Sequence, residues 1–179
     1  AVYGVDQNQP ITEDQPFNSL YPYSRSLQMS EQVIKDVVQA DSDWRVAIMR
    51  YGNVAGAYPT GVLGEWPSNI PSNLFPYLAQ VARKERDHLD IYGDQYDTAD
   101  GTALRDYVHI MDVVEANMYA LGWLFNQRQV LEEFNICTGQ ATSVKAAANS
   151  FSKVSEQHIE QQIVDARSGD VGVLIGNPS

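Results

Sequence analysis

The residues best able to do chemistry in this chain include one thiol and three imidazoles. Cys137 lies in the run FNICTG (134–139), which is typical of a short buried strand, so a packed thiol is favoured over a nucleophile. His88 and His158 lie in polar stretches and are expected to be solvated, whereas His109 precedes a helix and is expected to be structural. No His, Cys or carboxylate residues have the spacing of a metal site, so we predict no metal.

Two further groups have both a structural and a chemical interpretation. Tyr23 and Leu27 fall one helical turn apart on one face, a spacing equally typical of a core stripe and of a site. The sequence Arg105-Asp106-Tyr107 could form a local ion pair beside a strand, or it could supply a cation to a ligand. Residue type alone does not decide between these interpretations.

Composition excludes several classes of partner. The chain has 179 residues and a formal net charge of -11, and a surface that negative repels phosphate backbones and anionic lipids. We therefore expect neither nucleic acid nor a membrane as a partner, and no apolar run reaches the roughly 18 residues of a membrane span. A single cysteine permits no intrachain disulfide and fits a reducing compartment, so a cytoplasmic location is expected.

Hydrophobic periodicity predicts helices that alternate with strands, which indicates an α/β fold. Asp112 is the predicted N-cap of one helix, with Glu115 completing a capping box. Residues 52–72 hold four Gly and three Pro and are predicted to form a long loop of the kind that carries function. The predicted helices cover 23–39, 73–84, 112–126 and 143–154, and the predicted strands cover 45–51, 88–92, 107–110, 134–137 and 161–164.

Four segments follow a recognisable pattern of residues. Residues 50–77 read RYGNVAGAYPTGVLGEWPSNIPSNLFPY, and residues 100–116 read DGTALRDYVHIMDVVEA. Upstream lie AVYG and YPYSRSLQMSEQ, and downstream lie FNICTG and ARSGD. In order and spacing, across nearly the whole chain, these segments resemble the UDP-galactose/UDP-glucose 4-epimerases of the extended short-chain dehydrogenase/reductase superfamily.

The resemblance implies a fold and an activity. Residues 1–52 would be the remnant of a Rossmann-type parallel sheet from an NAD-binding domain. Residues 53–179 would be mostly a smaller mixed α/β domain that binds UDP-sugars, truncated at its C-terminal end. The complete enzyme would oxidise C4 of UDP-glucose or UDP-galactose transiently with NAD and return the hydride, in galactose metabolism. Family members are commonly homodimers, and the isolated chain is expected to be inactive.

The resemblance also assigns roles to single residues. Tyr23 aligns with the catalytic tyrosine, which exchanges a proton with the sugar 4-hydroxyl, and Tyr23 and Tyr51 align with positions at the cofactor. Arg105 and Arg167 align with diphosphate-binding arginines, whose guanidinium forks suit bidentate phosphate contacts. The aligned substrate-binding positions are Asn53, Asn73, Leu74, Tyr92, Arg105, Arg167, Asp170 and Leu174.

Several of these positions have a more detailed implied role. Asn73 and Leu74 open a helix whose N-terminus suits the diphosphate, with further contacts to uracil. Tyr92 aligns with an aromatic residue at the uridine, and Asp170 with an acceptor for the ribose hydroxyls. Leu174 aligns with a position that sets pocket size, and a residue of intermediate bulk there leaves UDP-N-acetylhexosamines open as ligands.

The chain departs from the family pattern in ways that keep other functions open. Leu27 stands where the family has a lysine whose cation favours the tyrosine's phenolate and holds the nicotinamide ribose. The family's proton-relay serine and its Gly-rich NAD-binding turn are also not found in the chain. One alternative is therefore a truncated pseudoenzyme that binds UDP-sugars without turnover, and a weaker one is a nucleotide-sugar dehydratase or decarboxylase.

Overall fold

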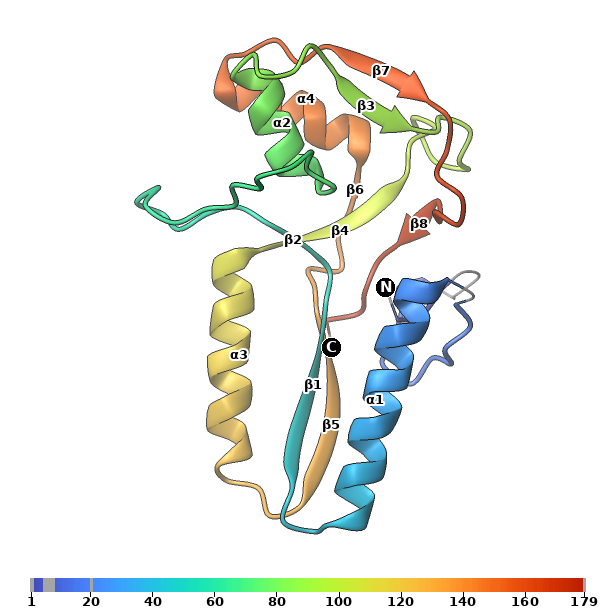
Figure 1. Ribbon diagram of the computed structural model, residues 1–179, viewed down its shortest axis with the longest axis vertical. Helices are drawn as coiled ribbons and strands as arrows, with labels where there is room; N and C mark the ends of the chain where they lie inside the picture. The colour runs from blue at the N-terminus through green and yellow to red at the C-terminus, as the bar shows by residue number, and fades with distance from the viewer. Residues whose placement is uncertain (1, 5–8, 20, 179) are drawn as a thin grey trace.

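The computed structural model describes residues 2–4, 9–19 and 21–178. Ala1 and Ser179, the first and last residues of the two predicted domains, lie outside the described residues. The described chain is a mixed α/β structure with parallel strand pairs, as predicted. It has an elongated lower half and a smaller upper half (Figure 1).

The lower half is built on two parallel strands. β1 (Arg45–Tyr51) pairs with β5 (Val130–Ile136) along its full length. Helices α1 (Pro22–Ala40) and α3 (Ile110–Leu124) flank this pair on opposite sides (Figure 1). The apolar run RVAIMRY suits a strand covered on both faces, which is how parallel strands are usually placed.

The upper half contains short strands and two helices. β4 lies between β2 and β6 and also pairs with β8, while β3 and β7 form a separate parallel pair. The strands of the upper half are β2 (Asn53–Ala55), β3 (Leu89–Tyr92), β4 (Leu104–His109), β6 (Ala141–Ser143), β7 (Gln161–Val164) and β8 (Val173–Leu174). The helices of the upper half are α2 (Leu74–Ala82) and α4 (Val144–Ser155).

The main core of the upper half lies between its two helices and β3. Leu78 and Ala148 are fully buried there, one on α2 and one on α4. Leu89 and Ile91 alternate with two pocket-facing residues on β3, so the strand gives one face to this core. The core therefore holds β3 in place while the opposite side of the strand stays available to a ligand.

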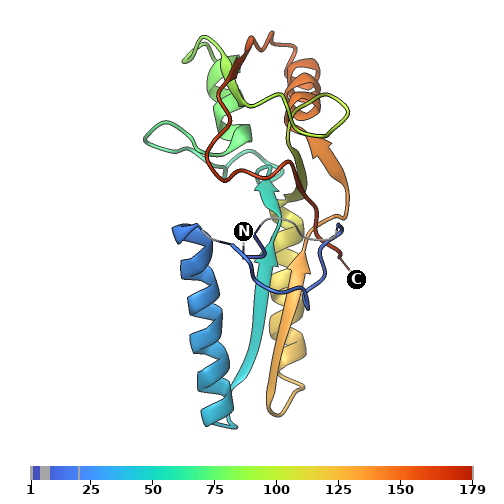
Figure 2. The ribbon, with the colours of Figure 1, turned by 90° about the vertical axis from the view of Figure 1, so that its right-hand side faces the viewer.

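The N-terminal and C-terminal segments lie together where the two halves meet (Figures 1 and 2). Ile11 forms an isolated parallel bridge with Gly176, and its amide donates to the carbonyl of Ile175 at 2.8 Å. Val2, Tyr3 and Ile11 form a second apolar cluster, against which Phe17, Leu27 and Leu174 pack. This cluster joins α1 to β8.

Most predicted elements are confirmed, with two kinds of difference. The prediction of Asp112 as an N-cap is wrong, because β4 leads directly into α3 and His109 is the N-cap, with its Nδ1 accepting from the amide of Met111 at 3.2 Å. Asp112 instead lies in the first helical turn, where its charge complements the helix dipole. The short strands β2, β6 and β8 were not predicted, because two or three residues give no readable period.

The predicted division at residue 52 remains a prediction. β5 belongs to the second predicted segment but pairs with β1 of the first, so the two segments share one sheet. Among the described residues, no helix is long and apolar enough to cross a membrane.

The first prediction concerns the core of the upper half. Leu78→Ala should lower the free energy of unfolding by about 2–5 kcal/mol, because the side chain is fully buried and leaves a cavity. Val154→Ala is the control, since Val154 is 85% exposed and should change that free energy by less than about 0.5 kcal/mol. Urea unfolding followed by circular dichroism measures both. Equal midpoints for the two variants would contradict this account of the core.

Candidate functional site

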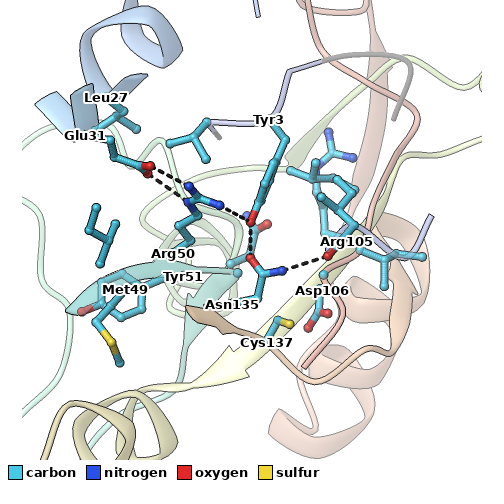
Figure 3. A pocket seen from close by; sticks show the side chains of 18 of the residues that line it. Tyr3, Leu27, Glu31, Met49, Arg50, Tyr51, Arg105, Asp106, Asn135 and Cys137 are labelled. Atoms are coloured by element: carbon cyan, nitrogen blue, oxygen red, sulfur yellow. Dashed lines mark hydrogen bonds and ion pairs between the residues drawn. The ribbon is translucent and has the colours of Figure 1, made fainter. Parts of the chain in front are cut away.

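The larger of two neighbouring cavities lies between α1, the upper ends of β1 and β5, and the C-terminal segment (Figure 3). Its volume is about 580 Å³. Tyr23 and Leu27 line it from α1, and Leu174 lines it from β8. Six of the predicted site residues meet there: Tyr23, Leu27, Tyr51, Asn53, Arg105 and Leu174.

The smaller cavity, of about 130 Å³, lies in the upper half between α2, β3, β4 and the 167–170 turn. Tyr92 lines it from the pocket-facing side of β3, and Arg167 and Asp170 line it from the turn. Seven predicted residues meet there: Asn53, Asn73, Leu74, Tyr92, Arg105, Arg167 and Asp170.

Asn53 and Arg105 line both cavities, so the two spaces adjoin. The parallel pairing of β2 with β4 sets this junction, with Asn53 opposite Tyr107. Gly52 allows the chain to pass between them, since a Cβ there would lie 2.9 Å from the carbonyl oxygen of Asp106. All eleven of these residues therefore line one composite space, whose two parts differ in the side chains that they offer to a ligand.

Arg105 is bound to the end of the 167–170 turn. Its Nη2 forms an ion pair with Asp170, and its Nη1 donates to the carbonyl of Val171 at 2.8 Å. The alternative of a local ion pair with Asp106 is wrong, because consecutive strand residues point to opposite faces. Asp106 is instead buried and accepts from Thr138 and from the amide of Gly139.

Arg167 and Tyr92 form the second cationic feature of the smaller cavity. The guanidinium carbon of Arg167 lies 3.8 Å from the centroid of the Tyr92 ring, which is a cation–π contact. The Arg167 side chain belongs to an exposed residue, so its charge faces solvent and an incoming anion. Arg105 and Arg167 offset the charges of Asp90 and Asp170 in the lining, so this cavity is less negative than a chain with a net charge of -11 would suggest.

The N-terminus of α2 also faces the smaller cavity. Asn73 is the N-cap residue, but its side chain makes no capping hydrogen bond and donates to Glu65 Oε1 at 3.0 Å. The amides of Leu74 and Phe75 in the first turn have no acceptor within the helix, and Pro76 has no amide hydrogen. Backbone amides at a helix start are suited to an anion.

Burial raises the pKa of two tyrosines beside the arginines. Burial is the main cause for Tyr107, which lines the smaller cavity, and the positive Arg105 only partly offsets it. For Tyr96, burial and the negative Asp170 both raise the pKa. Both phenols are therefore neutral at ordinary pH and can only donate or accept hydrogen bonds.

Tyr23 and Leu27 have different surroundings despite their common face. Tyr23 is 70% exposed in the first turn of α1, with its ring at the mouth of the larger cavity. Leu27 packs against the apolar cluster of Val2, Tyr3 and Ile11. The position that would hold a cation is thus an apolar contact in this chain.

The residues present do not fit NAD as a complete ligand. The arginines that line the larger cavity are Arg50 and Arg105, and both are paired, with Glu31 and Asp170 respectively. Arg50 is buried in its pair with Glu31, and Arg105 lies at the junction with the smaller cavity, so the described lining of the larger cavity offers no further arginine to a dinucleotide pyrophosphate. The exposed phenol of Tyr23 faces the cavity, whereas Tyr51 donates its hydroxyl to Asn117 Oδ1 on α3 at 3.0 Å.

Three residues at the larger cavity were not singled out from the sequence. Arg50, Glu31 and Asn135 line it and are buried together beneath the apolar cluster (Figure 3). An arginine inside the apolar run RVAIMRY was the available signal, because a buried cation requires a buried partner. Among the described residues, no group of three His, Cys, Asp or Glu side chains could hold a metal ion.

Comparison with known proteins gives one family. The pattern of the "NAD dependent epimerase/dehydratase family" matches residues 1–137. The chain is 40% identical over 179 residues to a UDP-glucose 4-epimerase of Bacillus subtilis, covering 100% of this chain and 52% of that protein. It is 41% identical over 177 residues to UDP-glucose 4-epimerase 4 of Oryza sativa, covering 99% of this chain and 48% of that protein.

Solved structures agree with this result. A UDP-glucose 4-epimerase from Stenotrophomonas maltophila, with bound NAD and formylated UDP-arabinopyranose, matches with a TM-score of 0.94 at 36% identity. The enzyme from Bifidobacterium longum, in complex with NAD+ and UDP, matches with a TM-score of 0.94 at 35% identity. Each match covers 99% of this chain and 52% of the other, so the chain spans about half the length of the relatives it matches.

The second prediction concerns the thiol in the larger cavity. Burial, and then the nearby Asp106 carboxylate, raise the pKa of Cys137 to about 11 from an ordinary value of 9.0. Since only the thiolate reacts, alkylation by iodoacetamide at pH 8 should be about 100-fold slower than for an unperturbed thiol. The rate should keep rising until the pH passes 11. The urea-unfolded chain is the control, and equal rates for folded and unfolded protein would contradict the prediction.

Proposed function

Because the chain belongs to the NAD dependent epimerase/dehydratase family, we propose that it is the UDP-sugar-binding part of a UDP-glucose/UDP-galactose 4-epimerase. The observation that supports this most directly is the pair of adjoining cavities. The smaller one combines two arginines with a helix N-terminus, and the larger one has an exposed tyrosine at its mouth. A nucleotide diphosphate needs the first chemistry, and a reacting sugar needs the second.

The smaller cavity would hold the UDP moiety. Arg105, Arg167 and the first amides of α2 would bind the diphosphate by charge-assisted hydrogen bonds. Tyr92 would contact the uridine, and Leu74 would pack at the uracil. These roles are compatible with the short distance between Arg167 and the Tyr92 ring.

Binding would rearrange one contact that exists without ligand. Arg105 is paired with Asp170, and a diphosphate is a stronger partner for a guanidinium than a single carboxylate. Asp170 would then be free to accept from the ribose hydroxyls. After the exchange Arg105 is paired with the diphosphate and Asp170 accepts hydrogen bonds from the ribose hydroxyls, so both charged groups keep polar partners.

The hexose would extend past Asn53 and Arg105 into the larger cavity, between Tyr23 and Leu174. Tyr23 would hold and release the proton of the sugar 4-hydroxyl. Leu174 would limit the space beside the hexose, and the volume of about 580 Å³ leaves room for an N-acetyl group. UDP-glucose and UDP-galactose are the proposed ligands, with UDP-N-acetylhexosamines as possible additional ones.

The cofactor NAD supplies the redox chemistry of the complete enzyme. The burial of Arg50 in its pair with Glu31 supports the view that this chain does not hold NAD alone, since the other arginine at the larger cavity, Arg105, is assigned to the UDP diphosphate. We expect the isolated chain to be inactive, and the complete enzyme to be a homodimer that works in cytoplasmic galactose metabolism. The division into residues 1–52 and 53–179 is part of the same proposal.

A second function, UDP-sugar binding without turnover, is favoured by one observation. Leu27 packs in an apolar cluster, so the family's cation cannot be replaced there by a small movement of the chain. The two functions differ in one assay. Conversion of UDP-glucose to UDP-galactose by any NAD-supplied assembly that contains this chain would exclude the binding-only function.

The third prediction tests the proposed function itself. A ligand at about 100 times its dissociation constant should add about 2.7 kcal/mol to the folded state. UDP-glucose should therefore raise the melting temperature of the chain, whereas NAD should leave it unchanged. A cooperative melt that UDP-glucose does not shift would contradict the proposal.

The fourth prediction concerns the diphosphate contact. Arg167→Ala should weaken UDP binding by about 10–100-fold, because a hydrogen bond to a charged group contributes about 1.5–3 kcal/mol. Arg128→Ala removes the same charge from an exposed position in the turn between α3 and β5 and should leave the affinity within about twofold. Titration calorimetry measures both. Equal losses in the two variants would show that only net charge matters.

A further inference from the structure

Arg50 directs all three of its guanidinium nitrogens at acceptors inside the fold (Figure 3). Nε and Nη2 donate to the two carboxylate oxygens of Glu31 at 3.0 and 2.7 Å, which is a bidentate pair. Nη1 donates to Tyr3 Oη at 3.0 Å and to the carbonyl of Glu13 at 2.8 Å. Arg50 is only 8% exposed, so these contacts lie in a region of low dielectric, where each is strengthened.

The first branch from Arg50 runs to the helix that bears Tyr23. Glu31 lies eight residues after Tyr23 and four after Leu27 on α1, so all three share one face. A fork-to-fork pair fixes both the distance and the rotation of the carboxylate relative to the guanidinium. Arg50 thereby sets how α1 is rotated against β1, and with it the direction in which Tyr23 faces the cavity.

A second set of hydrogen bonds leads from Arg50 to the opposite wall of the larger cavity, which Leu174 lines. Tyr3 Oη donates to Asn135 Oδ1 at 2.5 Å, and Asn135 Nδ2 donates to the carbonyl of Ile11 at 2.8 Å. The same carbonyl accepts from the amide of Asn177 at 2.8 Å, and the Ile11 amide donates to Ile175. Leu174 precedes Ile175 and lines the larger cavity, so a continuous set of hydrogen bonds joins Arg50 to that wall.

The rings around the guanidinium keep this arrangement rigid. Arg50 lies 5.1 Å from the ring centroids of both Tyr3 and Phe17, so its charge is held by two aromatic contacts. Glu133 Oε1 lies 3.5 Å from Nη2, and Lys35 forms an ion pair with the same carboxylate. Among the described residues, Arg50 and Lys35 are thus paired with Glu31 and Glu133, and the guanidinium is already bound by acceptors of the fold, so Arg50 is not expected to bind a ligand directly.

We propose that Arg50 is a positioning residue. It holds the two walls of the larger cavity, one lined by Tyr23 on α1 and the other by Leu174 on β8, at a fixed separation. It does so through Glu31 on one side and through Tyr3, Asn135 and Ile11 on the other. This inference rests on the proposed function, because the space it sets is where the hexose would lie. The smaller cavity, where UDP would bind, shares Arg105 and Asn53 with the larger cavity, and its described lining contains none of the residues of the Arg50 network.

This arrangement separates hexose recognition from UDP recognition. A loosened Arg50 network would weaken contacts to the hexose and leave those to UDP in place. The ratio of the UDP-glucose affinity to the UDP affinity is therefore the informative quantity. A residue that only stabilised the fold would lower both affinities together.

The experiment uses two variants of different severity, each with a matched control. Arg50→Lys keeps the charge but removes the planar fork, and Tyr3→Phe removes only the hydroxyl that joins Arg50 to Asn135. The controls are Arg45→Lys, on the same strand, and Tyr119→Phe, which is 75% exposed on α3. Calorimetry with UDP and with UDP-glucose should show an affinity ratio at least about 10-fold lower in each variant, with UDP changed by less than about twofold.

A second measurement needs no ligand and tests the network directly. Amide hydrogen exchange at Ile11 and Asn177 should accelerate in Tyr3→Phe, because their hydrogen bonds depend on the held carbonyl and on β8. Exchange at Leu89, in the separate core, should stay unchanged. Tyr3→Phe is conservative enough to keep the chain folded even if Arg50→Lys does not fold.

The outcomes are distinct. An unchanged affinity ratio in Tyr3→Phe, or unchanged exchange at Ile11 and Asn177, would overturn the positioning role. Failure of the unmodified chain to bind UDP would contradict the proposed function, and the exchange measurement would then still decide whether Arg50 couples the two walls.

Discussion

The parallel pairing of β1 with β5 is the constraint on which both cavities depend. Parallel neighbours place their carboxyl ends at one edge, and ligands of open α/β sheets bind in the crevice outside that edge. Gly52 and Cys137, which follow the two strands, meet there, where the amide of Gly52 donates to Ile136. From this edge the chain continues as β2, which carries Asn53, and as the turn before β6. Both β2 and β6 pair with β4, which carries Arg105 to the junction. The carboxyl ends of β1 and β5 thus determine where the upper half begins.

Much of the fold could be predicted because its long elements have clear periods. The 45–51 strand, the helix that follows Ser143 and the 161–164 strand are where hydrophobic pattern and capping chemistry placed them. The start of α3 could not be predicted from the Asp112 capping box. Pairing with β2 extends β4 as far as His109, so the helix starts directly after that residue. The His109 ring nitrogen then accepts the capping hydrogen bond that was expected of a carboxylate. Tertiary pairing overrode a local signal.

The candidate site, like the fold, could be predicted only in part. Residues with an obvious polar function, such as Arg105 and Arg167, could be selected from the sequence, and the structure brings them to one cavity. The partners of those residues could not be selected, because Arg105 pairs with Asp170, which is 65 residues away in the chain. Arg50 was missed for the same reason, since its partners Glu31, Tyr3 and Glu13 come from distant segments. Pairing across such separations has no local signature.

The distribution of charge reconciles a negative chain with a site for an anion. A net charge of -11 acts over the whole surface, but salt screens its effect beyond about 8–10 Å. Within the smaller cavity, the guanidinium groups of Arg105 and Arg167 balance the two lining carboxylates, and the N-terminus of α2 adds its partial positive charge. The acidic surface then opposes polyanions and large anionic surfaces, while a compact diphosphate can still be accepted.

The register that joins Arg45 to Val130 also has a consequence for how the chain folds. The two residues are about 85 positions apart, so the first hydrogen bond of this pair closes a long loop. Closing a loop of that size lowers the conformational entropy of the chain before any contact between the strands offsets the loss. Folds with many such long-range pairings are therefore slow to form. During synthesis β1 therefore leaves the ribosome well before its partner exists. For most of that interval α1, which precedes β1, can cover one face of this apolar strand, whereas α3 is made only shortly before β5, so the edge that β5 will cover stays exposed to aggregation until then.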